Sequence, residues 1–569
     1  MNLSHLVSRR PLILVLFFTI ISVFLHFYNL NWGAPFYFHP DELNIATSVA
    51  QLQFPNQMNP HFFAYGSLPI YTIYFTGFLI NIISNPLQST THNLQPNFEQ
   101  AILISRFYSA LFATLLIPLI FVIARSIATK QSQMGSPNGV GLIAALLTTF
   151  SVGIIQFSHF GTFEIWLTFF TTLLFWCCLF IKQHATTRLT IVLALLTGTL
   201  VSIKISHVAI IPMALFVITL QEIIQNKNRH HLLKFISILR GFLLFFFIVF
   251  FIYLLTNPYV FIDTKSFIGS MQYESSLALG TLPVFYTGEF FNQLPVVFQF
   301  LHIYPFLINP LLTIIFIPSF LYIIWKALKT KNLTYILLTA FYLILFSSQA
   351  FLFAKWTRYM VPTLPFIYLT IALAFYDVIA RNKTTKQSPN RLLHPLKLLT
   401  VIILIFINFL FAISYFITAF VKPDTRIDAF NFAKQIIPSG ATILSETYDL
   451  GITPFNELPA KIELVNFYDL DNFSNLTTFN NLKNTLEQKQ YIILPSQRIL
   501  KSRIINQNKF PNGNLFYKQL LGGRLGYTKI YETPCDIFCK IIYLEDPVFS
   551  FEQTASVFDR PTVMIFKRT

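Results

Sequence analysis

Residues 38–43 read Phe-His-Pro-Asp-Glu-Leu, and they come shortly after an apolar run, residues 11–29, with the sequence PLILVLFFTIISVFLHFYN. A run of this length can cross roughly 30 Å of hydrocarbon, so the acidic pair Asp41 and Glu42 is expected just beyond one membrane surface. Two adjacent carboxylates at that place are costly to desolvate and need water, a cation or a proton to handle. The alternative is that Asp41 only caps a helix over residues 43–52, because Pro-Asp is a common helix start.

Composition indicates the class of protein. Hydrophobic residues make up 54% of the 569 residues and charged residues 11%, and apolar runs of spanning length recur along the chain. These features predict a polytopic α-helical membrane protein. The first run follows Arg9 and Arg10 as in a signal peptide, but no small-residue cleavage site comes after it, so we expect a retained helix.

About eleven transmembrane helices are predicted, and they make residues 1–421 a transmembrane domain. The segments are residues 11–29, 101–124, 140–157, 163–181, 189–203, 207–221, 241–256, 306–325, 333–350, 361–380 and 399–421. Lys and Arg gather in the loops on the N-terminal side, which predicts a cytoplasmic N-terminus in the plasma membrane and an outer location for the chain beyond residue 421. Residues 68–83 are also apolar, but a span there would place Arg125 and Lys130 outside.

Residues 422–569 have a different composition, with 17 Lys and Arg, 15 Asp and Glu, and no apolar run of spanning length. We expect an extracytoplasmic soluble α/β domain. Its predicted elements are a helix from Asp424 to Gln435 and strands at 441–444, 491–494 and 563–566. Cys535 and Cys539 are spaced for a disulfide if the compartment is oxidising.

The charges that break the topology rule are informative. In this arrangement the cations at or beyond the outer surface before residue 422 are Arg106, Lys204, Lys265, Lys355 and Arg358. The carboxylates on that side are Asp41, Glu42, Glu99, Glu164, Asp263, Glu274 and Glu289. Sparse cations beside several carboxylates suit a phosphate-bearing lipid together with acid or base chemistry. For Lys265 and Lys355 we favour the simpler interpretation, in which each snorkels or pairs with a neighbouring acid.

Several short motifs resemble one family when they are taken in order. After the acidic pair come Leu68-Pro69-Ile70-Tyr71, Ser105-Arg106-Phe107-Tyr108, Ser158-His159-Phe160-Gly161 up to Glu164, Ser202-Ile203-Lys204, Asn257-Pro258-Tyr259 with Asp263, and Arg358-Tyr359-Met360-Val361-Pro362. This order resembles the GT-C fold glycosyltransferases, and within them the bacterial relatives of dolichyl-phosphate-mannose protein mannosyltransferases and the lipid A aminoarabinose transferases. The resemblance covers most of residues 1–421.

The resemblance implies a membrane glycosyltransferase that takes a sugar from a polyprenyl-phosphate donor on the outer face. The acceptor hydroxyl would belong to a protein, a lipid or a glycan of the cell envelope. The residues support a lipid-linked donor independently, because the chain has no Gly-rich phosphate loop or dinucleotide fingerprint. A transporter or lipid flippase is the alternative, and a noncatalytic sugar-binding scaffold is a third option. The net charge of +16 does not point to nucleic acid, because most of the excess lies in the inner loops.

Three carboxylates are the predicted catalytic residues. A hydroxyl is a weak nucleophile, and a carboxylate within hydrogen-bond reach can remove its proton. We assign this role to Asp41, expect Glu42 to orient the acceptor or Asp41, and expect Glu164 to line the site. Family members commonly carry Asp at the position of Glu164, and the aminoarabinose transferases have a charged pair near Ser67 that this chain lacks.

Three cations are the predicted contacts to the donor phosphate. Arg358 comes first, because a guanidinium can hold phosphate oxygens bidentately and offset charge on the leaving group. Lys204 comes second, with a snorkelled helix end as the alternative. Arg106 comes third, with a pair to Glu99 as the alternative. No metal is assigned and no cofactor is certain, although a divalent metal stays open, because His39, His61 and His159 lack ligand spacing.

Overall fold

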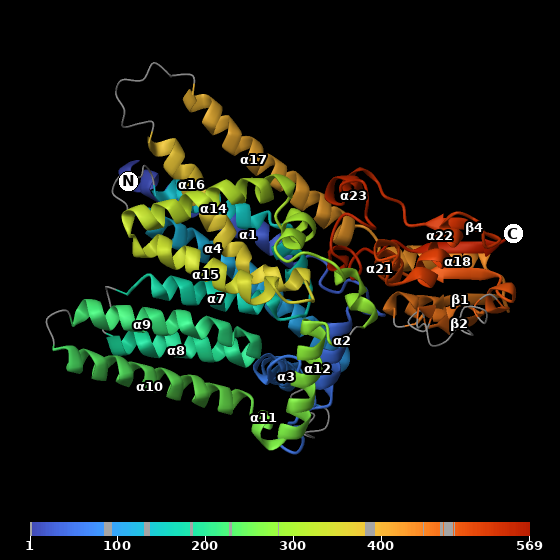
Figure 1. Ribbon diagram of the computed structural model, residues 1–569, viewed down its shortest axis with the longest axis horizontal. Helices are drawn as coiled ribbons and strands as arrows, with labels where there is room; N and C mark the ends of the chain where they lie inside the picture. The colour runs from blue at the N-terminus through green and yellow to red at the C-terminus, as the bar shows by residue number, and fades with distance from the viewer. Residues whose placement is uncertain are drawn as a thin grey trace.

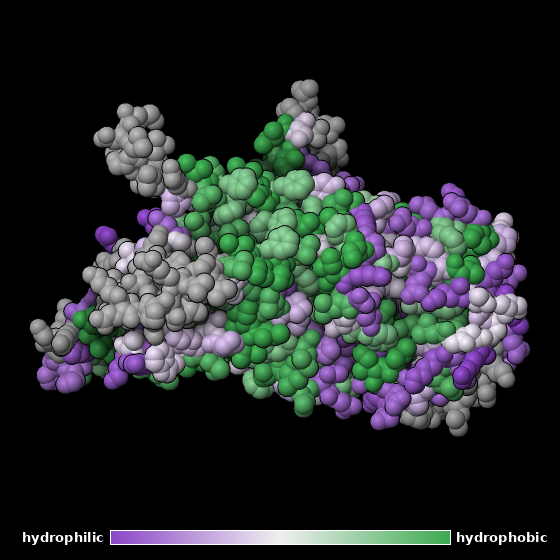
Figure 2. Space-filling view, turned by 90° about the horizontal axis from the view of Figure 1, so that it is seen from above, coloured by the Kyte–Doolittle hydropathy of each residue, from purple (hydrophilic) through white to green (hydrophobic). Residues whose placement is uncertain are grey.

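The computed structural model describes residues 3–84, 94–129, 137–181, 186–226, 230–282, 284–381, 393–447, 449–466, 470–471, 482 and 484–569. The chain is a multi-pass membrane protein. In the described ranges, eight helices are long and apolar enough to cross a membrane, or nine if a bent pair counts as one, and three shorter apolar helices accompany them. Figure 2 shows apolar side chains across the middle of the molecule. Large apolar side chains are exposed on the described helices, and Phe247 on α10 is one of them, at 68% exposed.

Each predicted span coincides with a helix. These helices are α1 (Leu3–Phe27), α4 (Phe98–Thr129), α5 (Pro137–Thr149) with α6 (Val152–His159), α7 (Glu164–Cys178), α8 (Thr186–Ile203), α9 (Ile211–Gln225), α10 (His231–Thr256), α14 (Pro310–Thr330), α15 (Leu333–Ala350), α16 (Leu364–Arg381) and α17 (Leu393–Phe416). The segment predicted at 140–157 is the bent pair α5 and α6, which meet at 52°. The hydroxyl of Ser151 accepts from the Ile154 N–H and starts α6 in its new direction.

The N-terminus lies at one end of the helical bundle and residues 422–569 lie at the other, which we call the domain end (Figure 1). Short helices gather at the domain end. They are α2 (Pro40–Ala50), η2 (Ile205–Ile210), α11 (Tyr259–Ile262), α12 (Thr264–Leu279), η3 (Phe285–Phe290), η4 (Gln299–Ile303), α13 (Tyr304–Leu307), η5 (Thr357–Thr363) and η6 (Ile417–Val421). Several loop cations expected at the opposite end, Lys130, Lys182, Lys227, Arg229, Lys383 and Arg391, lie outside the described residues.

The apolar stretch at 68–83 forms α3 (Ser67–Ser84), and both of its ends lie at the domain end. Just before α3, the Gly66 N–H donates to Ile203 O, the last residue of α8, over 2.8 Å. Near its other end, the Asn81 amide donates to the carbonyls of Leu94 and Gln95, just ahead of α4, over 3.1 Å each. Although α3 has the length and composition of a span, these contacts hold both of its ends at the domain end of the bundle. The sequence analysis had left residues 68–83 out of the spans because of the charges Arg125 and Lys130.

The C-terminal part contains a five-stranded sheet in the order β2-β1-β3-β5-β4. The strands are β1 (Thr442–Glu446), β2 (Lys461–Val465), β3 (Tyr491–Leu494), β4 (Tyr527–Glu532) and β5 (Met564–Arg568). β1 pairs in parallel with β2 and β3, whereas β5 is antiparallel to both β3 and β4. The helices around the sheet are α18 (Thr425–Ile436), η7 (Leu450–Glu457), α21 (Arg498–Ile505), α22 (Pro511–Leu521), α23 (Ile537–Ile542) and η8 (Gln553–Ala555).

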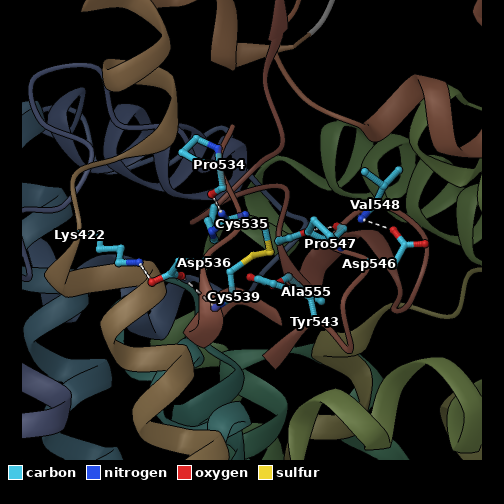
Figure 3. The surroundings of a disulfide bond; sticks show 12 residues. Lys422, Pro534, Cys535, Asp536, Cys539, Tyr543, Asp546, Pro547, Val548 and Ala555 are labelled. Carbon is cyan, nitrogen blue, oxygen red and sulfur yellow. Dashed lines mark hydrogen bonds and ion pairs between the residues drawn. A yellow bond between two sulfur atoms is a disulfide. The ribbon is translucent and has the colours of Figure 1, made fainter. Parts of the chain in front are cut away.

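The last third of the C-terminal part packs into the core of the bundle. Cys539, Tyr543 and Phe551 belong to the same buried cluster as the helices, whereas the sheet has separate cores. Cys535 and Cys539 form a disulfide at the start of α23 (Figure 3). Beside it, Lys422 forms an ion pair with Asp536. We propose that residues 422–569 form one domain, whose segment around the disulfide docks it on the helices.

Candidate functional site

Asp41 and Arg358 meet at the domain end of the bundle, although 317 positions separate them in the chain. Asp41 lies in the first turn of α2 and Arg358 in η5. The Arg358 Nη1 donates to Asp41 Oδ2, and both side chains are 25% exposed. The helix begins at Pro40, and its N-cap, His39, makes no side-chain capping bond. The carboxylate of Asp41 is therefore paired with a cation and does not act as the cap.

Tyr65 connects Asp41 to the second carboxylate. Its hydroxyl lies 3.3 Å from Asp41 Oδ2 and 3.2 Å from Glu164 Oε1. Glu164 starts α7, is buried, and leaves Oε2 without a hydrogen-bond partner in the described residues. Lys204, at the break between α8 and η2, places Nζ 4.0 Å from Glu164 Oε1 and 4.8 Å from the centre of the Tyr65 ring. These five residues form a compact group, which we call the acid–cation cluster.

A pocket opens beside the acid–cation cluster. Arg358, Lys204 and Glu164 supply its charged lining. Its other walls come from α7, η2, α15 and η5, with the residues Leu167, Ser206, His207, Ala209, Ile210, Leu345, Ser348, Gln349, Tyr359 and Pro362. The pocket therefore combines two cations with largely apolar walls, an arrangement that fits an anionic headgroup attached to a hydrocarbon chain.

The electrostatics of the cluster keep Asp41 ionised. Burial alone would raise the pKa of this carboxyl, but the Arg358 guanidinium, together with His39 and Lys204, holds it below its ordinary value. Glu274, on α12, lies nearby, and burial raises the pKa of its carboxyl despite the attraction of Arg358 and Lys204. Burial and the charges of Glu164 and Asp41 raise the pKa of Tyr65, so its hydroxyl remains protonated. The cluster thus keeps Asp41 available as a proton acceptor at neutral pH.

Glu42 and Arg106 form a buried ion pair with each other. The sequence analysis expected Glu42 to orient the acceptor or Asp41, and Arg106 to contact the donor phosphate. Arg106 Nε and Nη2 donate to the two Glu42 oxygens over 2.9 and 2.6 Å, and Nη1 donates to the carbonyls of Leu30 and Trp32. Glu42 also accepts from the Gly161 N–H. Both side chains are buried, and the expected alternative partner of Arg106, Glu99, accepts from Tyr37 instead. This pair joins α2 to α4, and neither residue lines the pocket.

Replacing Glu42 with Gln is expected to lower the free energy of unfolding by about 3–5 kcal/mol, because Arg106 would remain buried without its counter-ion. Thermal unfolding of the detergent-purified protein measures the change. Glu532→Gln is the matched control, since the Glu532 and Lys529 side chains are each 41% exposed and such a pair contributes about 1 kcal/mol or less. Equal effects of both variants would contradict a structural role for the Glu42 pair.

The sequence analysis did not identify Tyr65 or Glu552 as site residues. Tyr65 comes just before Gly66, where an added Cβ would lie 1.9 Å from Ser202 O. Only glycine fits so close to another backbone, so the Tyr-Gly pair was the feature of the sequence that could have pointed to Tyr65. Glu552 lies in the C-terminal part, and its Oε2 accepts from the N–H and hydroxyl of Thr357 over 3.1 and 2.6 Å. The C-terminal part therefore holds Thr357, the residue just before Arg358.

The three histidines considered as metal ligands each have separate contacts. His39 packs on Phe160 and Phe558, His61 lies 4.0 Å from Asp263, and His159 stacks on Phe420. In the described part of the chain, no group of three His, Cys, Asp or Glu residues is placed to hold a metal ion. Lys355 donates to the carbonyls of Leu352 and Phe353 and is buried, which agrees with a structural role.

Comparison with solved structures identifies the fold. The oligosaccharyltransferase of Archaeoglobus fulgidus, tethered to an acceptor peptide, aligns with 98% of this chain and 88% of its own at 13% identity and a TM-score of 0.50. ArnT from Cupriavidus metallidurans bound to undecaprenyl phosphate aligns over 98% of both chains at 10% identity and a TM-score of 0.43. No protein-family model and no curated protein sequence matches the chain. The chain has the GT-C fold, which confirms the resemblance read from the motifs.

Proposed function

We propose that this protein is a membrane glycosyltransferase that moves a sugar from a polyprenyl-phosphate donor to an acceptor hydroxyl. The observation that carries the proposal is the acid–cation cluster at the edge of an apolar pocket. A carboxylate held ionised beside two cations provides both functions that the transfer needs, a base for the incoming hydroxyl and positive charge for the leaving phosphate.

In the proposed reaction, Asp41 accepts the proton of the acceptor hydroxyl as the hydroxyl oxygen bonds to the anomeric carbon of the sugar. The bond between that carbon and the phosphate oxygen breaks, and the polyprenyl phosphate leaves with the electron pair. Arg358 and Lys204 stabilise the negative charge that develops on the phosphate. Glu164 and Tyr65 fix the positions of Lys204 and Asp41 through the contacts described above.

The donor headgroup would displace part of the Arg358–Asp41 contact when it binds. Arg358 lines the pocket and Asp41 does not, so the guanidinium can turn toward a phosphate while the carboxylate faces the acceptor. Apolar residues such as Leu167, Ile210 and Leu345 line the same pocket and would contact the first isoprene units. Glu42 and Arg106 support this arrangement from outside, by fixing α2 against α4.

A transfer assay tests the function. The purified protein in lipid is given a polyprenyl-phospho-sugar with a radiolabelled sugar and candidate protein, lipid and glycan acceptors. We expect label on an acceptor and release of polyprenyl phosphate. Movement of an unmodified lipid or solute across the bilayer without bond transfer would support the transporter alternative instead. Binding of the donor with neither transfer nor movement would support a noncatalytic scaffold.

We infer that the C-terminal part lies outside the cytoplasm, since the disulfide between Cys535 and Cys539 belongs to an oxidising compartment. The exposed position Ser439, in the C-terminal part, is expected to react with a membrane-impermeant maleimide in intact cells once it is replaced by Cys. Thr330→Cys, exposed at the opposite end of α14, is the matched control and should react only after lysis. The reverse pattern would contradict the proposed orientation.

A further inference from the structure

The carboxyl edge of the parallel strands faces the helical bundle. β3 ends at Leu494, and α21, which follows it, packs against η3 of the bundle, with the Asn506 amide donating to Gly288 O over 2.9 Å. β5 runs antiparallel to β3 and carries the C-terminus to the far end of the molecule (Figure 1). The loops after β1 and β3 therefore lie between the sheet and the bundle.

β1 and β3 are neighbouring parallel strands, and the chain leaves them toward opposite edges of the sheet. The chain goes from β1 to β2 on one side, and from β3 to β4 and β5 on the other. Crevices of this kind, at the carboxyl ends of adjacent parallel strands, are where open α/β sheets bind ligands. Asp449 comes after β1 and Arg498 after β3, so both lie at this crevice.

Arg498 has no hydrogen bond or ion pair from its guanidinium in the described part of the chain, and its Nε is buried. The Asp449 oxygens accept from Ser496 and Gly451. Aromatic rings surround the guanidinium, with ring centres 4.9 Å away in Phe285, 5.3 Å in Tyr286 and 5.7 Å in Phe558. A partly buried cation without a counter-ion is costly, and an anion from a ligand would offset that cost.

Ring contacts connect the surroundings of Arg498 to the acid–cation cluster. Phe558 packs on His39, next to Asp41, at 4.3 Å between ring centres. Tyr286 lies 5.8 Å from the Trp356 ring, and the Arg358 guanidinium lies 5.7 Å from that same ring. Burial lowers the pKa of Arg498, while the charges of Asp449 and Asp41 act in the opposite direction. Arg498 and its aromatic neighbours do not line the pocket assigned to the donor.

We propose that Arg498, walled by Phe285, Tyr286 and Phe558, binds an anionic group of the acceptor, so that the acceptor is a molecule carrying a carboxylate or a phosphate near its reacting hydroxyl. The inference rests on the proposed transferase function. Arg358 and Lys204 serve the donor phosphate, whereas Arg498 comes from the C-terminal part, and the Phe558 ring beside it packs on His39, near Asp41. A guanidinium fork matches carboxylate and phosphate oxygens alike.

Matched acceptors test the proposal. The probes are octyl glucoside, octyl glucuronide with a carboxylate, and octyl glucoside 6-phosphate with a phosphate, each offered with the polyprenyl-phospho-sugar donor. The wild-type protein should have a KM at least about tenfold lower for one or both charged probes than for the neutral one. Arg498→Gln should remove this preference by raising the KM for the charged probes to that for octyl glucoside. Arg498→Lys should keep part of the preference for charged probes, because lysine keeps the positive charge but lacks the planar guanidinium.

The control is Arg524→Gln, which removes the same charge from an exposed turn at the far end of the C-terminal part. Equal KM values for all probes in the wild type, or a preference that survives Arg498→Gln, would overturn the proposal. Direct binding of the three probes, measured without donor, tests the anionic subsite separately from the proposed transferase function. A charge preference in binding that depends on Arg498, without any transfer, would support the anionic subsite and count against the transferase. Transfer without a charge preference would support the transferase and count against the anionic subsite.

Discussion

Asp41→Asn is expected to lower the rate of sugar transfer by about 10²-fold or more, while the affinity for the polyprenyl-phosphate donor stays close to that of the wild type. Asparagine keeps the size of the side chain but cannot accept the proton of the acceptor hydroxyl. Donor affinity is expected to persist because Arg358, released from its ion pair, remains free to hold the phosphate. Single-turnover transfer and equilibrium donor binding, measured on the same preparation, separate the two quantities.

Asp263→Asn is the control for this variant. Asp263 is a half-buried carboxylate at the same end of the bundle, which accepts from the Asn59 amide over 3.0 Å, and it lies outside the acid–cation cluster. Its replacement should leave transfer unchanged. Normal turnover by Asp41→Asn would remove Asp41 as the base.

The pH dependence of transfer follows from the same carboxylate. The pKa of Asp41 is held below its ordinary value, so the group remains a base as the pH falls through the range in which a free aspartate protonates. The acid limb of kcat/KM should therefore lie below that range in the wild type. Arg358→Lys, which weakens the pairing, should move the limb to higher pH.

Arg358→Ala is expected to weaken donor binding and to slow transfer by about 10²–10³-fold, because the leaving phosphate loses its bidentate partner. The loss should appear in both KM for the donor and kcat. Arg358→Lys should recover binding more than rate, since a point charge attracts the phosphate but does not reproduce the fork. Donor titrations at saturating acceptor give both constants.

Lys265→Ala provides the comparison for Arg358→Ala. Lys265 is an exposed cation on α12 at the same end of the protein, so its removal changes the local charge without touching the pocket. If Arg358→Ala and Lys265→Ala had equally small effects on donor kinetics, Arg358 would have no place in the donor site.

The helical part could be predicted from the sequence because apolar length alone specifies a span. α3 is the exception, because it also has the length of a span and only the charges of the next loop, Arg125 and Lys130, argued against one there. The strands β1, β3 and β5 were predicted because they are buried apolar runs. β2 and β4 were missed, since they are edge strands whose residues alternate irregularly between exposed and half-buried positions.

The residues of the candidate site could be predicted from the sequence only in part. Sequence analysis placed Asp41, Glu164, Lys204 and Arg358 on one side of the membrane, and the structure brings them together. It could not decide which opposite charges pair, so it assigned Arg106 to the donor, whereas Arg106 is buried against Glu42. Pairing depends on how helices pack, and residues distant in sequence such as Arg498 enter the site only through the fold.

The contact between Glu552 and Thr357 has a consequence for biosynthesis. Glu552 follows all the helices of the bundle in the sequence, so η5 lacks this support until the C-terminal part has been made and has docked. A nascent chain with all its helices already inserted would still lack a fixed Arg358. The proposed donor site would thus be complete only after the C-terminal part has docked.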